Sequence, residues 1–281
     1  MRLALLTLLF MLAVGQPAAA DTASDLDRYM TARAALGQFS GTVMVVKGDA
    51  VLLEKGYGYA DVGARIPATA ATRYPVASLT KAVTALAILR LRDAGKLSLD
   101  DSVCRFVDPC PDAWKPVTLA MLVHHTSGVP DYEARLELGS AAYLAFMSAP
   151  DSAARIIADA RGRPLDFPAG SDFAYSNTGY ILLAAVISRA SGRPYADYIR
   201  DAVLRPAGMA RAGLGGAKDL ALPIADGPGH SSADIAAGLS LETMMRADIP
   251  ALDLAGDHGD AALFATARDL QAMLMTIRTT A

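Results

Sequence analysis

The stretch Ser78-Leu-Thr-Lys-Ala-Val-Thr-Ala-Leu-Ala-Ile-Leu-Arg-Leu-Arg-Asp-Ala-Gly95 decides the fold of this chain. It predicts a helix from Ser78 to Ala94, with Ser78 as the N-cap and Gly95 as the stop signal. Apolar residues occupy nearly every position before Arg90, so little of the helix is polar. A helix of this kind is buried on almost all sides, which places it at the centre of a domain.

Ser78 and Lys81, at the start of this helix, form a candidate catalytic pair. Residues three apart share a helix face, so the Lys81 amine can lie beside the Ser78 hydroxyl. A serine hydroxyl is a weak nucleophile until a neighbouring base takes its proton, and a buried lysine can be that base. The helix N-terminus adds a partial positive charge beside the reacting oxygen. On the alternative interpretation, Ser78 is only an N-cap and Lys81 a surface lysine.

A second candidate group, Tyr175-Ser176-Asn177, contains the only asparagine of the chain. A tyrosine beside a serine–lysine pair can pass a proton to the leaving group. The Asn177 amide can hold both the lysine and a substrate carbonyl. Alternatively, Tyr175 is an aromatic side chain packed in a loop.

These motifs resemble those of the serine β-lactamase and penicillin-binding-protein superfamily, specifically its class C-like branch with D-alanyl-D-alanine carboxypeptidases and related esterases. In that family Ser-x-x-Lys carries the nucleophile and the base, and Tyr-x-Asn follows on a loop of the helical subdomain. The matching residues here are Ser78, Lys81, Tyr175 and Asn177. Residues 125–128 (His-Thr-Ser-Gly) also match, and residues 263–270 look like the family's late helical segment. The resemblance implies an α+β fold, with an antiparallel sheet flanked by helices and a helical subdomain.

The family's third motif, Lys-Thr-Gly or His-x-Gly on a strand beyond the late helix, has no counterpart here. His258-Gly259 lacks the spacer residue, and the Lys-Gly pairs at 47 and 55 lie in an N-terminal hairpin. We therefore expect residues 21–281 to form a single β-lactamase-like domain that lacks the C-terminal strands and is inactive or poorly folded by itself. The alternative is that residues between Gly213 and Asp260 supply the missing sheet.

Other residues that could suggest chemistry are expected to be structural. The resemblance implies that His125 is hydrogen-bonded in a turn of the helical subdomain, and it gives His124 no catalytic role. His230 and His258 have no partners at ligand spacing, so we expect solvated loop histidines. Trp114 is expected to pack in the core or against a loop. No metal and no cofactor are predicted.

The rest of the chain predicts one hairpin and a long helical segment. A helix is expected from Asp21 to Leu36, and strands at 41–46 and 51–57 flank a turn at 47–50. Further helices are predicted at 118–123, 141–146, 152–160, 178–190, 195–204 and 266–277. Residues 213–260 are rich in Gly, Ala, Asp and Pro and are interpreted as a loop with short helical pieces.

The N-terminus has the pattern of a secretory signal. Met1-Arg2 precedes an apolar run from Leu3 to Val14, and Ala18-Ala19-Ala20 supplies small residues for cleavage. We expect residues 1–20 to be removed and the mature chain to be periplasmic or secreted. The apolar run is too short to span a bilayer comfortably, so no membrane span is predicted.

Cys104 and Cys110 are the only cysteines, and an exported protein meets an oxidising compartment. We predict a structural disulfide, which would add about 2 kcal/mol because its loop is short. Two free buried thiols are the alternative. A metal site is less favoured, because no histidine lies close in sequence and the spacing is wider than zinc motifs use.

The net charge is −3 and no Lys/Arg-rich run occurs, which argues against a nucleic-acid or acidic-lipid partner. We expect a monomer that acts on a small-molecule or peptidoglycan-derived substrate. The predicted activity is attack by Ser78 on an amide or ester carbonyl of the β-lactam or D-alanyl peptide type, through an acyl-enzyme. Two alternatives stay open: a non-catalytic or fragmentary penicillin-binding relative, and a small-ester esterase.

Overall fold

The computed structural model describes residues 18–61, 64–134, 146, 149, 151–215 and 258–280. The α-helices are α1 (Ala18–Ala35), α2 (Thr80–Asp93), α3 (Leu119–Val123), α5 (Ser152–Arg161), α6 (Asn177–Ser191), α7 (Tyr195–Ile199) and α10 (Ala267–Thr280). Single helical turns of other types are η1 (Ala77–Leu79), η2 (Val103–Arg105), η3 (Asp112–Trp114) and the π-helical η4 (Arg200–Leu204). The strands are β1 (Gly41–Lys47), β2 (Ala50–Tyr57), β3 (Tyr59–Asp61), β4 (Ile66–Pro67), β5 (Tyr74–Pro75), β6 (Gly213–Leu214) and β7 (Leu263–Ala265).

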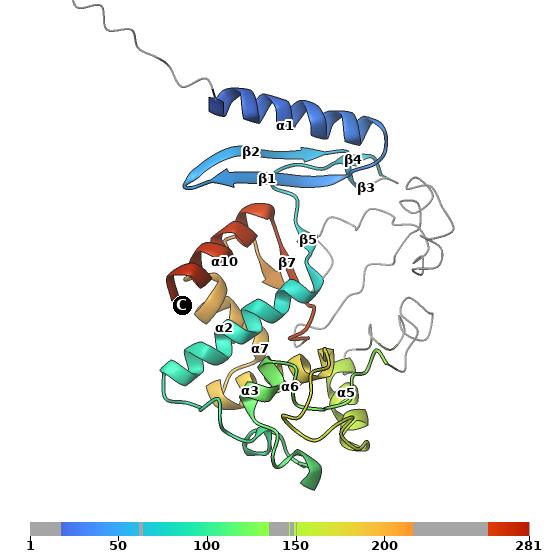
Figure 1. Ribbon diagram of the computed structural model, residues 1–281, viewed down its shortest axis with the longest axis vertical. Coiled ribbons are helices and arrows are strands. Elements are labelled where there is room, and N and C mark those ends of the chain that lie inside the picture. Colours follow the sequence, from blue (N-terminus) through green and yellow to red (C-terminus); the bar gives the residue numbers. More distant parts are fainter. Residues whose placement is uncertain are drawn as a thin grey trace, which may run out of the picture.

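The predicted hairpin forms one layer of the molecule. β1 and β2 pair antiparallel, with Gly41 opposite Tyr57 at the open end. α1 lies over one side of this hairpin and α10 packs against β1 from the other side (Figure 1). Lys55 and Tyr57 of β2 both donate to Asp27 of α1, at 2.7 and 2.8 Å, and so fix that helix on the hairpin. The helix begins at Ala18, a little before its predicted start.

A small three-stranded sheet links the hairpin layer to the helices. Its order is β5-β7-β6, with β7 antiparallel to both neighbours. The Val76 amide donates to the Leu263 carbonyl at 3.0 Å, which extends the pairing to the residue before η1. The expectation that residues 263–265 belong to a late helical segment is wrong, because they form β7. Three residues are too few to show the alternation by which a strand is recognised.

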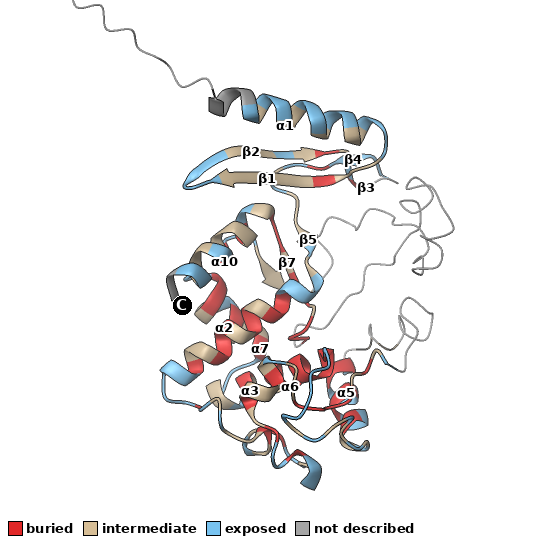
Figure 2. Ribbon diagram, in the orientation of Figure 1, coloured by how far each residue is buried: buried red, intermediate tan, exposed pale blue. Residues whose placement is uncertain are grey.

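The predicted central helix is confirmed. α2 packs against α6, α7 and η4, and most of its side chains are buried (Figure 2). α6 carries the other half of this interface and also contacts α3 and α5. Ile88 of α2 and Leu182 of α6 have no exposed surface, and neither has Trp114, which confirms the packing role expected for that residue. The α+β architecture with a helical subdomain is therefore as predicted.

The other helices and the disulfide lie largely where the sequence predicts them. The helices predicted at 118–123, 152–160, 178–190 and 195–204 are present, although the last changes to a π-helical turn at Arg200. Cys104 and Cys110 are joined by the predicted disulfide, with Cα atoms 5.3 Å apart. The predicted helix at 141–146 lies outside the described residues except for Phe146, as do residues 1–17 and 216–257. Among the described helices, none combines the length and apolar character needed to cross a membrane.

Candidate active site

Ser78 lies in η1, the single turn between β5 and α2. The prediction that Ser78 is an N-cap is wrong, because it lies inside η1. The N-cap of η1 is Val76 and that of α2 is Leu79, and neither side chain makes a capping hydrogen bond. Ala77 has φ +44°, which is unfavourable for a residue with a Cβ atom. The Thr80 hydroxyl donates to the Ala77 carbonyl at 2.6 Å and helps to hold this turn. The Ser78 hydroxyl faces Lys81 and Tyr175 from this turn.

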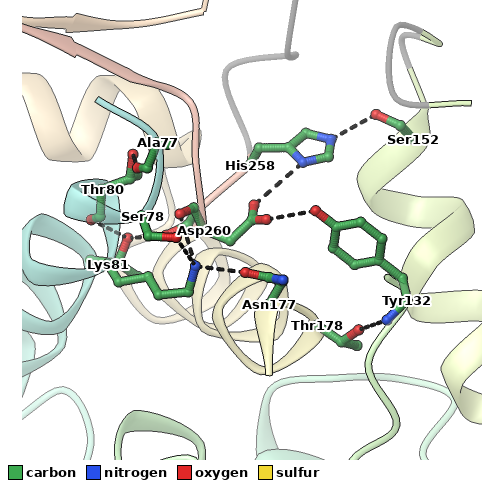
Figure 3. Close-up of polar contacts among 12 residues, drawn as sticks. Ala77, Ser78, Thr80, Lys81, Tyr132, Ser152, Asn177, Thr178, His258 and Asp260 are labelled. Atoms are coloured by element: carbon green, nitrogen blue, oxygen red, sulfur yellow. Dashed lines mark hydrogen bonds and ion pairs between the residues drawn. The ribbon is translucent and has the colours of Figure 1, made fainter. Parts of the chain in front are cut away.

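Lys81 is at the centre of the polar contacts of the site (Figure 3). It is buried, with only 6% of its surface exposed. Its Nζ atom lies 3.1 Å from Ser78 Oγ, 2.7 Å from Asn177 Oδ1 and 3.1 Å from the backbone oxygen of Asp260. The amide and backbone oxygens can only accept, whereas the serine hydroxyl can donate or accept. Lys81 Nζ can therefore donate to the two pure acceptors, and its remaining bonding direction faces Ser78 Oγ. A general base for Ser78 needs this arrangement.

Tyr175 approaches Ser78 from the loop before α6. Its hydroxyl donates to Ser78 Oγ at 2.7 Å, and Lys81 Nζ lies 4.9 Å from the centre of its ring. The ring stacks on His125 with centroids 4.7 Å apart, yet 49% of Tyr175 is exposed. Tyr175 is therefore not simply a packed loop aromatic, because its hydroxyl reaches Ser78 Oγ at an exposed position.

His125 has the structural position that the family resemblance implies. It has φ +60°, and its Nδ1 accepts a hydrogen bond from the Ser176 amide at 3.1 Å. Burial, followed by the positive charge of Lys81, lowers the pKa of His125. The neutral ring fixes the 175–177 loop, and Ser176 then caps α6 by accepting from the Gly179 amide at 3.0 Å.

Asn177 is the first residue of α6, and Asp131 holds it there. The backbone N–H of Asn177 donates to Asp131 Oδ2, and the backbone nitrogen of Thr178 lies 3.3 Å from the same oxygen. A carboxylate is favoured at a helix N-terminus because it accepts from free amide groups and complements the helix dipole. Sequence reasoning missed Asp131, since nothing local to it shows that it will meet α6.

His258 and Asp260 are the other residues that sequence reasoning missed. His258 is fully buried, so the prediction of a solvated loop histidine is wrong. Its Nε2 lies 2.7 Å from Ser152 Oγ, while Asp260 lies beside Lys81. Residues 213–260 were expected to be a loop with short helical pieces, but the end of that stretch, residues 258–260, is buried in the core. Within the described ranges, no group of three or more His, Cys, Asp and Glu side chains could hold a metal ion.

Comparison with known proteins assigns the whole chain to a family. The model of the beta-lactamase family matches residues 26–280. The chain belongs to the beta-lactamase family. Penicillin-binding protein 4* of Bacillus subtilis is a relative, 35% identical over 175 residues that make up 61% of this chain and 37% of that protein. Protein flp of Staphylococcus aureus strain MW2 is 33% identical over 172 residues, which make up 60% of this chain and 33% of the length of that protein.

Solved structures show the fold of this beta-lactamase family member. A penicillin-binding protein from Bacillus halodurans superposes with a TM-score of 0.71 at 27% identity, covering 90% of this chain and 73% of that one. A D-amino acid amidase from Ochrobactrum anthropi SV3 superposes with a TM-score of 0.69 at 22% identity, covering 91% of this chain and 71% of that one. At this identity the likeness supports the fold alone. The chain thus spans about a third to two fifths of the length of the curated relatives it matches.

Proposed function

We propose that this protein is an exported serine hydrolase in which Ser78 becomes acylated by a β-lactam, a D-alanyl peptide or an ester. One observation carries the proposal: Lys81 Nζ and Tyr175 OH both lie within hydrogen-bond distance of the same exposed serine hydroxyl. One of these groups is buried and can take the serine proton. The other is open to the solvent side and can pass a proton to a leaving group.

In the acylation step of the proposed reaction, Ser78, Lys81 and Tyr175 each have one role. Ser78 Oγ bonds to the substrate carbonyl carbon while its proton moves to Lys81 Nζ. The Ser78 amide is one donor for the oxyanion that develops. When the bond to the leaving nitrogen or oxygen breaks, the Tyr175 hydroxyl donates a proton to it and is re-protonated from Lys81. Water then attacks the acyl-enzyme, with the proton transfers reversed, and frees Ser78.

The surroundings of Ser78 favour a substrate with an apolar acyl group. Leu79 follows the nucleophile in the chain and is 47% exposed, and Phe173 is 64% exposed. The Phe173 ring meets His125 edge-on at 6.0 Å, beside the stacked Tyr175 ring. Relatives named penicillin-binding proteins support a penicillin as the first probe, and one with an aromatic side chain matches these exposed groups.

Export of the chain is part of the proposal. Residues 1–20 carry the signal pattern, and the Cys104–Cys110 disulfide is of the kind that persists in an oxidising compartment. We propose a periplasmic or secreted monomer. Size-exclusion chromatography coupled to light scattering checks the oligomeric state.

The decisive experiment is intact-mass spectrometry after exposure to benzylpenicillin and, separately, to 4-nitrophenyl acetate. We expect a covalent adduct that maps to the peptide containing Ser78 and is absent from Ser78→Ala. Ser171→Ala, which changes an exposed loop serine, is the matched control and should still form the adduct. A persistent penicillin adduct supports a binding or peptidase role, nitrocefin turnover supports a lactamase, and reaction with the ester alone supports an esterase. No adduct with either probe, or an adduct on another peptide, contradicts the proposal.

A further inference from the structure

A second polar cluster, made of Tyr132, Ser152, His258 and Asp260, lies next to Lys81 (Figure 3). All four residues are buried, with exposed fractions between 0% and 6%. The Tyr132 hydroxyl donates to Asp260 Oδ2 at 3.0 Å, and Ser152 Oγ lies 2.7 Å from His258 Nε2. The cluster connects α5 and the loop after α3 to the segment that leads into β7.

The contact between His258 and Asp260 closes this cluster. His258 Nδ1 lies 3.4 Å from Asp260 Oδ1. Neither atom has a hydrogen-bond partner in the described part of the chain, although both are buried. Buried polar groups without a partner are unfavourable, so two such atoms that face each other indicate an imidazole N–H directed at a carboxylate.

The main chain of the same segment lies along α2. The Asp260 carbonyl accepts from Lys81 Nζ at 3.1 Å, and the Gly259 carbonyl accepts from the Thr84 hydroxyl at 2.6 Å. Lys81 and Thr84 are neighbours on one helix face, so two successive carbonyls are bound to that face. The side chains of His258 and Asp260 anchor the segment from its other side.

We propose that Asp260 is a positioning residue for Lys81, held in place by Tyr132 and by the Ser152–His258 pair. The proposal rests on the function proposed for Lys81 as the base of Ser78. His258 carries its proton on Nδ1, facing Asp260, and its Nε2 accepts from the Ser152 hydroxyl. If the Asp260 carbonyl shifts, Lys81 loses one of its two pure acceptors. The lone pair of its amine is then no longer directed at Ser78 Oγ.

Ser152, His258 and Asp260 have the composition of a catalytic triad, but their burial argues for positioning instead. Ser152 and His258 have no exposed surface, so a substrate carbonyl cannot reach the Ser152 hydroxyl. A triad serine must be open to its substrate. The exposed nucleophile remains Ser78, and the buried cluster acts on it only through Lys81.

The first test compares acylation of the full chain by a fluorescent penicillin in the wild type, Asp260→Ala, Asp260→Asn and Ser152→Ala. Asp260→Ala removes both side-chain anchors and should lower the acylation rate constant at saturating probe by about 10-fold to 10²-fold. The half-saturating probe concentration should stay unchanged, because the cluster does not touch the probe. Asp260→Asn keeps an oxygen for the Tyr132 hydroxyl but turns its NH2 group toward the Nδ1–H of His258, so it should recover only part of the rate. Ser152→Ala should still be labelled on the Ser78 peptide.

A second readout does not depend on acylation. Reductive methylation of Lys81, followed by mass spectrometry, should be faster in Asp260→Ala than in the wild type, with the exposed Lys115 as the internal reference. Circular dichroism identifies a temperature at which every variant is folded, and both reactions are measured there. If Asp260 only stabilised the fold, the acylation and methylation rates of the folded variant would equal those of the wild type. Unchanged acylation and methylation in Asp260→Ala, or a label on Ser152, overturns the inference. An unlabelled wild type overturns the proposed function, and methylation then decides the positioning role by itself.

Discussion

At the scale of single residues, Tyr175 is placed by contacts that do not involve its hydroxyl group. The ring stacks on His125 at 4.7 Å and faces Lys81 Nζ at 4.9 Å. The hydroxyl is left to donate to Ser78 Oγ. Position and proton transfer can therefore be separated by removing one oxygen atom.

Tyr175→Phe should keep the fold and slow turnover by about 10²-fold, because a proton relay is lost while the ring contacts remain. The rate is measured with whichever probe acylates the wild type, and the fold by circular dichroism. Tyr29→Phe, at an exposed tyrosine of α1, is the control and should leave the rate unchanged. Turnover by Tyr175→Phe at the wild-type rate would mean that Tyr175 is only structural.

His125 makes stability depend on pH in a defined direction. Burial and the Lys81 charge lower the pKa of His125 below the usual histidine value of 6.5 in the folded protein. As the pH falls through about 6.5, the unfolded chain therefore binds a proton at this residue before the folded chain does. The contribution of His125 to the free energy of unfolding is complete above pH 6.5 and decreases as the pH falls towards the lowered pKa.

His125→Asn should reduce this loss of stability, measured by urea unfolding at pH 7.5 and pH 5.5. Asparagine tolerates positive φ, and its side-chain oxygen can accept from the Ser176 amide without titrating. Gly48→Asn, at an exposed turn position that also has positive φ, should leave the pH dependence unchanged. Equal pH dependence in His125→Asn and the wild type would contradict this assignment.

At the scale of elements, the segment 258–260 fits against α6 because residue 259 has no side chain. A Cβ atom at Gly259 would lie 2.5 Å from the Tyr180 carbonyl oxygen and 2.9 Å from Ala184 Cβ. Backbone atoms of a buried helix cannot give way, so the segment itself would have to move. Any such movement also displaces the neighbouring Asp260 carbonyl from Lys81.

Gly259→Ala should therefore lower the free energy of unfolding by about 1–3 kcal/mol, as is typical of overpacking. Urea midpoints measure the loss, and acylation should slow in the same variant. Gly162→Ala is the matched control, because its Cβ would meet nothing closer than Asp159 O at 3.5 Å. A wild-type midpoint for Gly259→Ala would show that the segment is not packed as described.

At the scale of the whole molecule, export, processing and disulfide formation should occur together. In a bacterial host, the full chain should appear in the periplasm or medium with Asp21 as its first residue, as shown by N-terminal sequencing. Its intact mass should be two hydrogens below that of the reduced chain, because Cys104 and Cys110 are paired. The same chain started at residue 21 and kept in the cytosol should contain two thiols that alkylate. An unprocessed N-terminus, or free thiols in exported material, would contradict the expectation.

The features of this protein that depend on short-range spacing can be predicted from its sequence. The spacing of Ser78 and Lys81, the Tyr175–Asn177 motif, the hairpin and the buried central helix are all visible within single stretches of chain. Their physical basis is the helical or strand period, which needs no knowledge of distant residues.

Only the tertiary structure decided how the site is completed. Lys81 meets Asn177 across 96 positions of sequence and Asp260 across 179. Contacts of the same kind determine three further features: the position of Ser78 in the 3-10 turn η1, the short strand β7 and the burial of His258. Such contacts arise from packing between distant elements, and no local pattern of side chains encodes which carbonyl or carboxylate will meet a given lysine.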